Sequence, residues 1–408
     1  MNVIVIGGGA AGMIAAAEAA KAGNRTLLLE HNEKLGKKLF ITGKGRCNVT
    51  NDCDRAAFFE HVLQNPRFLF SAWAALDTRA LMDRFRALGV PLKTERGGRV
   101  FPESDKSSDI LRAMERDVRD SGAEVRLHTQ VTGVTARDGR VTAVETEAGA
   151  LPCDAVILAT GGRSYPQTGS TGDGYRFAEA LGHTIVPPAA SLVPLMTVED
   201  WPKKLSGITL KNVTLSAKVD GKPIFSELGE MLFTHFGVSG PLVLSLSGRI
   251  AGRPAGTKLS IDFKPGLTEE QLDARLLRDL SENARGQVGA ALHSLLPARL
   301  LDTVLALASV PPSTAVGELN KAARRRLVET LKGAPLTVAG ARTLDEAVIT
   351  RGGVSVKQID PSSMASRLVK GLYFAGEVID VDATTGGYNL QIAWMTGTLA
   401  GQLKGMEA

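Results

Sequence analysis

The chain has 408 residues, of which 44% are hydrophobic and 22% are charged, which excludes a disordered protein and predicts two or three domains. No apolar stretch reaches the roughly 18 residues of a transmembrane helix, and the N-terminus lacks the pattern of a signal peptide, so we expect a cytoplasmic protein. The net charge of +5 comes from dispersed basic residues, and with 5% aromatic residues and no recognisable nucleic-acid module we do not expect a nucleic-acid partner.

The first residues have the pattern of a nucleotide-binding βαβ unit. Residues 3–6 are a short β-branched run, typical of a strand that is buried on both faces of a parallel sheet. Residues 7–12 read GGGAAG, residues 13–22 predict an Ala-rich helix, and residues 26–29 predict a second strand that ends at Glu30. A GxGxxG motif between a strand and a helix, with an acid about 20 residues further on, indicates a dinucleotide site.

Each glycine of the motif has a physical role. Gly7 allows the tight turn, Gly9 lets a pyrophosphate approach the backbone, and Gly12 allows close packing of helix and strand. The helix N-terminus offers unpaired N–H groups and about half a positive charge to the phosphates. Glu30 lies where an acid accepts hydrogen bonds from ribose hydroxyls. These features predict a dinucleotide but do not distinguish NAD(P) from FAD.

Later segments repeat the pattern of a buried strand followed by a glycine turn. Residues 156–159 predict such a strand before Gly161 and Gly162, and residues 372–377 read LYFAGE. The arrangement resembles the glutathione-reductase-like flavoprotein superfamily, in which a late AG[DE] segment contacts the ribityl chain of FAD. No second GxGxxG stands in a βαβ context, so a nicotinamide cofactor would be a visitor without a Rossmann domain of its own.

That resemblance implies roles for further residues. Gly376 and Glu377 would lie against the ribityl and pyrophosphate groups. Val131, in a strand predicted over residues 128–134, would contact the adenine through its backbone. The glycine pair at 386–387 opens a predicted helix, whose backbone donors suit the electron-rich pyrimidine edge of a reduced flavin.

Four longer motifs resemble one family over essentially the whole chain, the BaiN/YhiN-like flavoproteins, also described as aminoacetone oxidase family FAD-binding enzymes. The motifs are TGKGRCN at 42–48, GGRSYP at 161–166, GEMLFTHFGVSGP at 229–241, and residues 376–391. The resemblance implies FAD as the cofactor, and because the sequence shows no covalent flavin anchor we expect the FAD to be bound noncovalently. It also assigns Lys37 and Lys38 to the cofactor.

The predicted fold class is α/β. The resemblance implies a Rossmann-like FAD-binding domain of the glutathione-reductase-like type, with an inserted β-barrel-like domain and a small helical domain. Residues 209–219 and 258–263 alternate apolar and polar side chains as strands do, and residues 268–332 have helical spacing. The expected limits are 1–190 with 345–408 for the FAD domain, 191–265 with about 335–360 for the β-rich domain, and 266–334 for the helical domain.

The motifs and the resemblance together assign a set of residues to the cofactor. The set is Gly7, Gly9, Ala10, Ala11, Gly12, Glu30, Lys37, Lys38, Thr42, Gly43, Lys44, Gly45, Arg46, Cys47, Asn48, Val131, Thr160, Gly161, Gly162, Gly376, Glu377, Asp382, Gly387, Asn389, Leu390 and Gln391.

The three cysteines indicate neither a disulfide framework nor a metal site. Cys47, Cys53 and Cys153 lack paired CxxC spacing, so we expect no metal. Cys47 and Cys53 suggest a redox pair, but the spacing is CxxxxxC, and the acidic surroundings of Cys53 disfavour a thiolate.

Three residues are candidates for the chemistry around the flavin. His235 and Tyr165 are possible proton donors, and Arg163 is a possible partner for a carboxylate or enolate oxygen. For each of them a structural role is the alternative.

The sequence leaves three functions open. The first is an oxidoreductase that passes a hydride from NAD(P)H through FAD to a small conjugated or carbonyl-containing substrate. The second is an FAD-dependent amine oxidase that uses O2. The third is a basic nucleic-acid-binding flavoprotein, which only the net charge favours. The oligomeric state is not indicated by the sequence.

Overall fold

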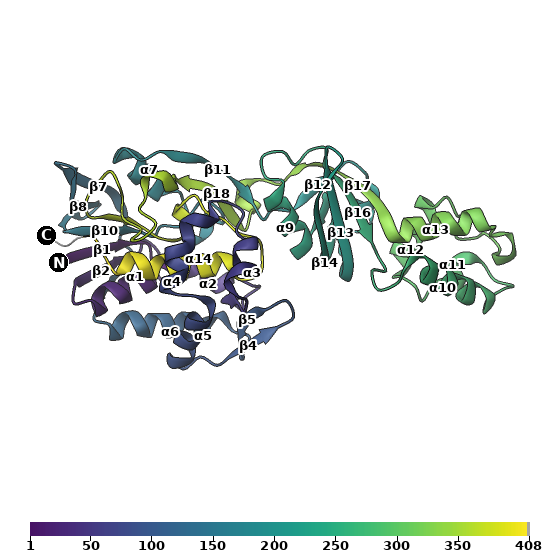
Figure 1. Cartoon of the computed structure of the whole chain (residues 1–408), viewed down its shortest axis with the longest axis horizontal. Helices are drawn as coiled ribbons and strands as arrows, with labels where there is room; N and C mark the ends of the chain where they lie inside the picture. The colour runs from purple at the N-terminus through teal and green to yellow at the C-terminus, as the bar shows by residue number, and fades with distance from the viewer. Residues whose placement is uncertain (406–408) are drawn as a thin grey trace. The chain divides into compact units, whose positions relative to one another are not determined.

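Residues 1–405 are described by the computed structural model, and the chain forms two compact units. The first unit comprises Met1–Ser191 together with the residues from Leu344 onward, and the second comprises Leu192–Thr343. Figure 1 labels the elements of both. Within residues 1–405 no helix is long and apolar enough to cross a membrane. Both ends of the chain therefore build one unit, and its middle builds the other.

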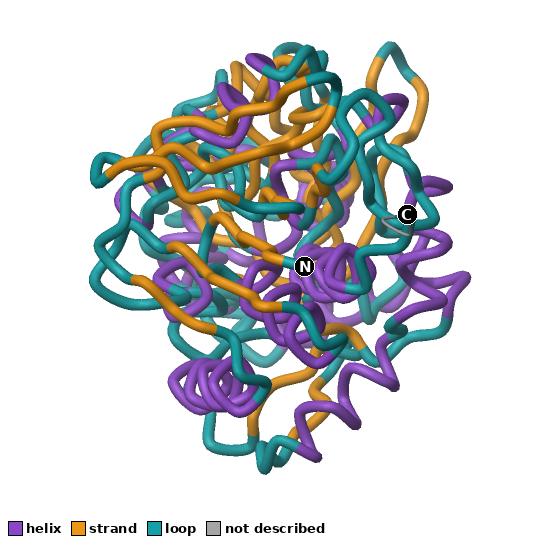
Figure 2. The backbone as a smooth tube through the Cα atoms, turned by 90° about the vertical axis from the view of Figure 1, so that its left-hand side faces the viewer, coloured by secondary structure: helices purple, strands orange, loops and turns teal. Residues whose placement is uncertain are grey.

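A five-stranded parallel sheet forms the centre of the first unit (Figures 1 and 2). The strand order is β19-β10-β1-β2-β6, so β1 lies in the middle. Four successive residues of β1 are buried, which shows that both of its faces are covered, as the β-branched run predicts. This sheet and the helix after β1 confirm the predicted Rossmann-like fold. The strands are β1 (Asn2–Ile6), β2 (Arg25–Leu29), β6 (Glu124–Arg126), β10 (Ala155–Leu158) and β19 (Leu372–Phe374).

Two helices from opposite ends of the chain pack closely against each other through glycine. A Cβ at Gly397 would lie 2.5 Å from the carbonyl oxygen of Ala11, and a Cβ at Gly401 would lie 2.7 Å from that of Ala15. Residues four apart share one face of a helix, so these two glycines let the backbones approach. The helices are α1 (Ala10–Lys21) and α14 (Tyr388–Gly401).

Two predicted boundaries in this unit are wrong. α1 begins at Ala10, three residues before the predicted start, because Gly9 already serves as its N-cap. The strand predicted over 128–134 begins only at β7 (Val131–Arg137), since His128 has a φ of +50°, outside the β region. β7 also pairs antiparallel with β8 (Arg140–Thr146) and stands outside the parallel sheet, in which β6 is an edge strand.

Smaller elements complete the first unit (Figure 1). The strand groups are β3-β5-β4, β7-β8-β9 and the antiparallel pair β11-β18. Asp54 and Asp77 cap the N-termini of α3 and α5 with their side chains. The strands are β3 (Thr50–Asn51), β4 (Leu92–Glu95), β5 (Arg99–Pro102), β8 (Arg140–Thr146), β9 (Gly149–Pro152), β11 (Ile185–Ser191) and β18 (Ile349–Val354). The helices are α2 (Lys37–Ile41), α3 (Arg55–Glu60), α4 (Phe70–Ala75), α5 (Thr78–Ala87), α6 (Ser107–Asp120) and α7 (Asp173–Ala180).

A closed barrel of six strands forms one part of the second unit (Figure 1). Its order is β12-β15-β14-β13-β16-β17. Leu215 of β13 and Ile261 of β16 are fully buried, as the alternation in these two segments predicts, and Phe233 of β14 is fully buried as well. The strands are β12 (Leu195–Thr197), β13 (Thr209–Val219), β14 (Lys222–Thr234), β15 (Gly237–Ser239), β16 (Lys258–Asp262) and β17 (Ala334–Ala341).

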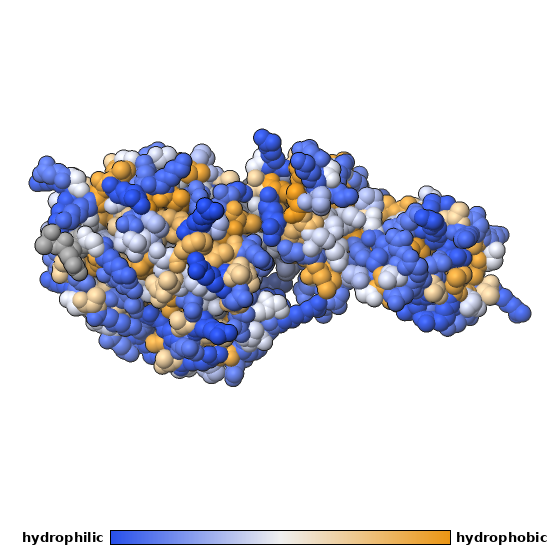
Figure 3. Space-filling model, in the orientation of Figure 1, coloured by the Kyte–Doolittle hydropathy of each residue, from blue (hydrophilic) through white to orange (hydrophobic). Residues whose placement is uncertain are grey.

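Helices form the other part of this unit and share a core with the barrel. Leu276, Leu300 and Leu327 belong to the same buried cluster as the inward residues of the strands. On the side seen in Figure 3, hydrophilic side chains cover most of the surface over α10–α13. Thr268 and Gln271 form a capping box at the start of α10. The helices are α8 (Trp201–Lys204), α9 (Pro241–Arg249), α10 (Glu269–Ser281), α11 (Val288–Ala291), α12 (Ala298–Leu307) and α13 (Lys321–Gly333).

The stretch 335–360, which we expected in the β-rich domain, is divided between the two units. β17 closes the barrel by pairing with β12 and β16. β18 pairs with β11, and both of these strands belong to the first unit. The barrel therefore receives only the beginning of this stretch.

Candidate functional site

The glycine-rich turn after β1 offers an open backbone surface. Gly7 has a φ of +105°, and a Cβ there would lie 2.5 Å from the carbonyl oxygen of Ala159, so the turn requires glycine. A Cβ at Gly12 would overlap the carbonyl oxygen of Gly7. A Cβ at Gly9, by contrast, would meet nothing within 4 Å, and Gly9 is the N-cap of α1 without a side-chain cap. The N-terminus of α1 therefore borders open space, as a pyrophosphate site requires.

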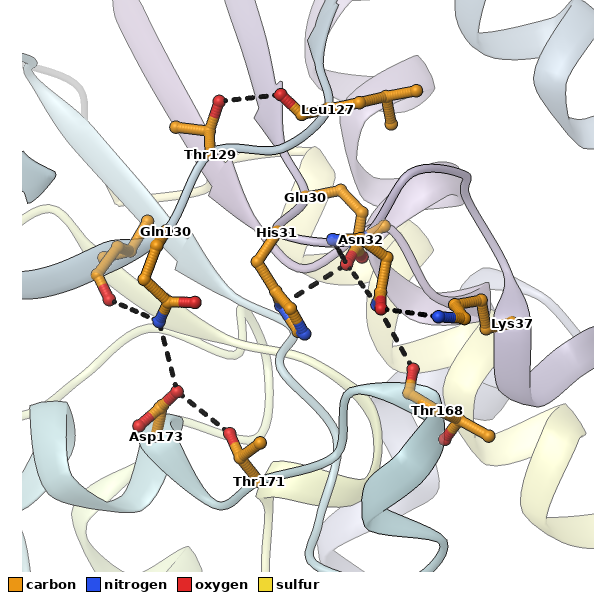
Figure 4. A network of polar contacts seen from close by, with 12 residues as sticks. Glu30, His31, Asn32, Lys37, Leu127, Thr129, Gln130, Thr168, Thr171 and Asp173 are labelled. Carbon is orange, nitrogen blue, oxygen red and sulfur yellow. Dashed lines mark hydrogen bonds and ion pairs between the residues drawn. The ribbon is translucent and has the colours of Figure 1, made fainter. Parts of the chain in front are cut away.

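Glu30 is held by donors from two turns (Figure 4). Its Oε2 accepts a hydrogen bond from the backbone N–H of Gly8 at 2.8 Å. Its Oε1 accepts from the backbone N–H and the side-chain amide of Asn32, at 2.9 and 2.7 Å, and His31 Nδ1 lies 3.4 Å away. Lys37 donates to the amide oxygen of Asn32 at 3.0 Å. A carboxylate has about four lone-pair sites, so Oε2 keeps one for a ribose hydroxyl.

The predicted adenine contact lies at the start of β7. The carbonyl oxygen of Val131 accepts a hydrogen bond from Gln130 Nε2 at 3.1 Å. Figure 4 shows Gln130 between this strand and Asp173, which accepts from Thr171 Oγ1 at 2.9 Å. This carbonyl is thus engaged within the protein, and the adenine contact stays a prediction.

Glu377 is the centre of a polar network that joins four segments of the first unit. Its Oε2 accepts a hydrogen bond from Lys38 Nζ at 2.8 Å. Its Oε1 accepts from Ser164 Oγ at 3.0 Å and from the backbone N–H of Thr350 at 2.8 Å. Lys38 also donates to Ser164 Oγ at 2.7 Å. A Cβ at Gly162 would lie 2.8 Å from Oε1, so glycine is needed for the turn to approach this carboxylate.

Sequence reasoning did not single out Thr350 or Ser164. Thr350 Oγ1 accepts hydrogen bonds from the backbone N–H groups of Arg163 and Ser164, at 2.8 and 3.0 Å, and so fixes the GGRSYP turn. Ser164 lies within that motif and could have been predicted from it. Thr350 is remote in sequence and lies in no motif, so only the pairing of β11 with β18 brings it here.

The three residues predicted for the chemistry lie in different surroundings. Arg163 is exposed and Tyr165 is half-buried with a φ of +53°, and both flank Ser164 of the Glu377 network. His235 is exposed and belongs to the second unit, in the turn between β14 and β15. The first two are therefore neighbours of one network, whereas His235 is part of the other unit. Their catalytic roles stay predictions.

The TGKGRCN segment is a tightly turned loop. The residues with positive φ are Gly43, Lys44, Gly45 and Cys47. Thr42 Oγ1 donates to the carbonyl oxygen of Lys38 at 2.8 Å. The guanidinium of Arg46 is paired with Glu95 and Asp105 and lies 4.1 Å from the ring centroid of Phe101. The charge of Arg46 is therefore balanced by carboxylates outside the loop.

The cysteines are poorly suited to thiolate chemistry. Burial raises the pKa of the Cys47 thiol to about 12. Burial, and then the nearby carboxylates of Asp54 and Asp52, raise the pKa of Cys53 to about 11. Thiols with pKa values this high are almost wholly protonated near neutral pH. The physical setting thus disfavours a redox pair of Cys47 and Cys53.

Side chains at the start of α14 are used within the protein. Gln391 is fully buried, accepts a hydrogen bond from Thr50 Oγ1 at 2.7 Å and donates one to the carbonyl oxygen of Leu76 at 2.8 Å. The side chain of Asn389 accepts from the N–H of Ala383 at 3.0 Å and donates to its carbonyl oxygen at 2.7 Å. The segment, which also contains Gly387 and Leu390, therefore has its backbone to offer a cofactor.

Asp382 is fully buried beside the end of β11. Its Oδ2 accepts a hydrogen bond from Ser191 Oγ at 2.7 Å. Burial raises the pKa of this carboxyl to about 6, although the hydrogen bond from Ser191 and then the positive charge of Arg351 oppose the shift. Asp380 and Glu377 add a smaller contribution in the direction of burial. The group is therefore an acid that titrates close to neutral pH.

Unsatisfied oxygens in the predicted cofactor segments provide a test of fit. Within residues 1–405, Asn48 Oδ1, Thr160 Oγ1 and Asp382 Oδ1 are buried without a hydrogen-bond partner. A buried oxygen without a donor costs about 1–3 kcal/mol. FAD carries donors in its ribityl and ribose hydroxyls. Together with the open space at Gly9 and the spare lone pair on Glu30, these residues fit FAD.

Comparison with known proteins gives the family and two well-aligned relatives. Residues 1–403 match the family described as HI0933-like protein Rossmann domain. The chain is 32% identical over 412 residues to the 3-dehydro-bile acid delta(4,6)-reductase of Clostridium scindens, covering 98% of each chain. It is 31% identical over 402 residues to the ribosomal RNA dihydrouridine synthase of Escherichia coli, covering 98% of this chain and 97% of that one.

Solved structures share the fold at low sequence identity. The 3-ketosteroid delta1-dehydrogenase from Sterolibacterium denitrificans superposes with a TM-score of 0.52 at 14% identity, covering 98% of each chain. A quinol-fumarate reductase superposes with a TM-score of 0.50 at 17% identity, covering 98% of this chain and 70% of that one. The match over residues 1–403 confirms the predicted resemblance. The chain belongs to the HI0933-like Rossmann-domain family, which includes the BaiN- and YhiN-type FAD-dependent oxidoreductases.

Proposed function

We propose that this oxidoreductase reduces a carbon–carbon double bond that is conjugated to a carbonyl, with NAD(P)H as the source of electrons. One observation carries the proposal: two relatives, similar over nearly their whole length, have names that describe this same change. A 3-dehydro bile acid has a 3-oxo group beside the double bonds that a delta(4,6)-reductase saturates. Dihydrouridine differs from uridine by two hydrogens across a double bond that is conjugated to a ring carbonyl.

The reaction requires a hydride and a proton for each double bond that is saturated. NAD(P)H is oxidised to NAD(P)⁺, one carbon of the double bond receives the hydride, and the carbon next to the carbonyl receives the proton. Bound FAD supplies the relay of the hydride between donor and acceptor. The protein has to bind and orient both reactants, exclude water, and provide the proton.

Residues of the first unit support these tasks. The open backbone at Gly9 and the acceptor Glu30 suit the pyrophosphate and the ribose of FAD. Lys38 and Glu377 fix the turns that carry Arg163 and Tyr165. In the GGRSYP turn, we propose the Tyr165 phenol as the source of the proton and Arg163 as the partner for the substrate carbonyl.

The test is the visible spectrum of the purified protein under anaerobic conditions. Oxidised flavin bands are expected, and NADPH or NADH should bleach them. A 4-en-3-one steroid or a uridine-containing RNA should then restore the bands and yield the saturated product by mass. Flavin bands that stay oxidised with both nicotinamides would contradict the electron donor. Peroxide formed from a small amine in air would favour the amine oxidase instead.

A further inference from the structure

The net positive charge of the chain lies entirely in the second unit. Residues 192–343 contain 19 Lys and Arg against 14 Asp and Glu. The rest of the chain contains 29 of each, so the first unit is neutral and the second carries the whole +5. The unit without the nucleotide-binding turn is therefore the one that attracts anions.

Part of this charge is concentrated on the outer face of the barrel. Lys218 of β13 stands directly opposite Lys258 of β16, and both side chains are exposed. Lys222 begins β14, where it pairs with Val219 just beyond the turn from β13. None of the three lysines forms an ion pair with any of residues 1–405. Like charges directly opposite each other destabilise a sheet, so the pair costs stability without a benefit inside the chain.

Hydroxyl groups extend the same outer face. Ser216 stands opposite Ser260 in the neighbouring strand, and each serine lies two residues along its strand from a lysine of the pair. Lys258 Nζ donates to Thr337 Oγ1 of β17 at 3.0 Å. We call Lys218, Lys222 and Lys258 with Ser216, Ser260 and Thr337 the lysine face. Lysine, serine and threonine side chains are common donors to nucleic-acid phosphates.

Acidic residues near the lysine face do not cancel its charge. Asp220 stands in the turn between Lys218 and Lys222, and the carboxylate of Glu199 accepts a hydrogen bond from the backbone N–H of Thr337 at 2.7 Å. These two acids leave the three lysines with an excess of one positive charge. Asp262, at the other end of β16, is held in an ion pair with Lys332 at 2.6 Å. The positive field is therefore local to the end of the sheet that carries the lysines.

We propose that the lysine face binds the phosphate backbone of RNA, so that the double bond reduced by this enzyme belongs to a uracil base in an RNA chain. The part about the uracil base rests on the proposed function, whereas the part about binding rests on the lysine face alone. The contacts are to phosphates, so binding is independent of sequence and weakens with salt. A small bile-acid substrate, with one charge at most, has no use for three clustered lysines.

The experiment measures RNA binding by the full-length protein loaded with FAD. Fluorescence anisotropy of a fluorescein-labelled oligouridine gives the dissociation constant between about 50 and 200 mM salt. The test variant carries Lys218→Gln, Lys222→Gln and Lys258→Gln. The matched control carries Lys357→Gln, Lys370→Gln and Lys404→Gln, three exposed lysines of the first unit. Flavin absorbance and melting temperature check that both variants are folded.

The test variant should bind the oligouridine roughly ten- to a hundredfold more weakly than the wild type at about 0.1 M salt, and the slope of log K against log salt should fall by about 2. The control should bind like the wild type. A wild type that does not bind, equal weakening in both variants, or an unchanged slope in the test variant would each overturn the inference. Equal affinity for anionic phosphatidylserine vesicles would also overturn it, since the face would then read charge in general.

The two proposals fail separately. A wild type that binds RNA through the lysine face, while neither nicotinamide bleaches its flavin, keeps the RNA site and removes the proposed electron donor. A wild type whose flavin is bleached and which saturates a steroid enone but ignores RNA keeps the reductase and removes the RNA site. Formation of dihydrouridine in a uridine-rich RNA, lost in the test variant and kept in the control, would support both.

Discussion

Replacing either of two glycines in the turn after β1 by alanine should separate cofactor binding from folding. A Cβ at Gly9 would meet no atom within 4 Å, and Gly9 has φ −80° and ψ −170°, which alanine adopts without strain. A Cβ at Gly12 would lie 3.0 Å from the carbonyl carbon of Gly7 and closer still to its oxygen. The first change fills the space proposed for the pyrophosphate, and the second forces the backbone apart.

The magnitudes follow from these surroundings. For Gly9→Ala, a less flexible unfolded chain adds about 0.4–1 kcal/mol of stability, and a poorer N-cap removes a similar amount, so the net change is close to zero. The added methyl group should remove one charge-assisted hydrogen bond to the pyrophosphate, which is worth about 1.5–3 kcal/mol. The affinity for FAD should therefore fall roughly ten- to a hundredfold. Gly12→Ala should cost about 3 kcal/mol or more of folding stability because a packed backbone has to move.

Urea unfolding of the FAD-free protein and flavin fluorescence titration measure the two quantities. A Trp201→Phe background leaves Trp73 and Trp394, so that intrinsic fluorescence reports the first unit alone. The control Gly266→Ala also places a Cβ in open space, but in the second unit, and should change neither quantity. If Gly9→Ala bound FAD as tightly as the wild type, the open space at this turn would not be the pyrophosphate site.

Three further predictions concern partly or fully buried groups of the first unit. Glu377→Ala should destabilise the unit by about 3 kcal/mol because it leaves Lys38 without its carboxylate. Glu377→Gln keeps an acceptor for Lys38 and should cost about 1 kcal/mol. Equal urea midpoints for the two variants would refute this difference. The double variant Cys47→Ser and Cys53→Ser should keep its turnover with NAD(P)H, since burial keeps both thiols protonated. A loss of turnover beyond tenfold in the folded variant would instead support a redox role for the two cysteines. Burial raises the pKa of Asp382 to about 6, so the protonated carboxyl contributes about 3 kcal/mol of stability that is complete below about pH 4 and is lost as the pH rises through 6. The free energy of unfolding of Asp382→Asn should not fall in this way between pH 4 and pH 6. If it falls as it does in the wild type, the pH dependence belongs to another group.

Local patterns in the sequence were sufficient for the elements whose side chains are sorted by burial. The β-branched run of β1 and the alternation in β13 predicted those strands because buried positions require apolar side chains, so the burial of a strand is visible in its sequence. β6 was missed because its three residues are all exposed and form no pattern. The pairing of β18 with β11 joins segments more than a hundred residues apart, and periodicity within one strand contains no information about its partner.

The candidate site was predictable where the backbone makes the site and less so where side chains do. Gly7 and Gly12 were predicted with their roles because the requirement for no Cβ is specific to glycine. Gln391 and Arg46 were assigned to the cofactor, yet Gln391 bonds to Thr50 and Arg46 pairs with Glu95. A polar side chain in a motif can face a cofactor or another part of the chain, and only the fold decides which.

On the proposals above, the division of charge between the two units offers a physical reason why relatives with similar sequences carry names with different substrates. The features that fit FAD, including the turn at Gly9 and the network at Glu377, all lie in the neutral first unit. The lysine face lies in the second unit, which the first does not need for its parallel sheet or its glycine turn. If both proposals hold, a change of substrate from an RNA to a bile acid requires changes only in surface residues of the barrel, while the proposed hydride chemistry stays in the first unit. We therefore expect the reductase chemistry to follow the first unit and the choice of substrate to follow the second.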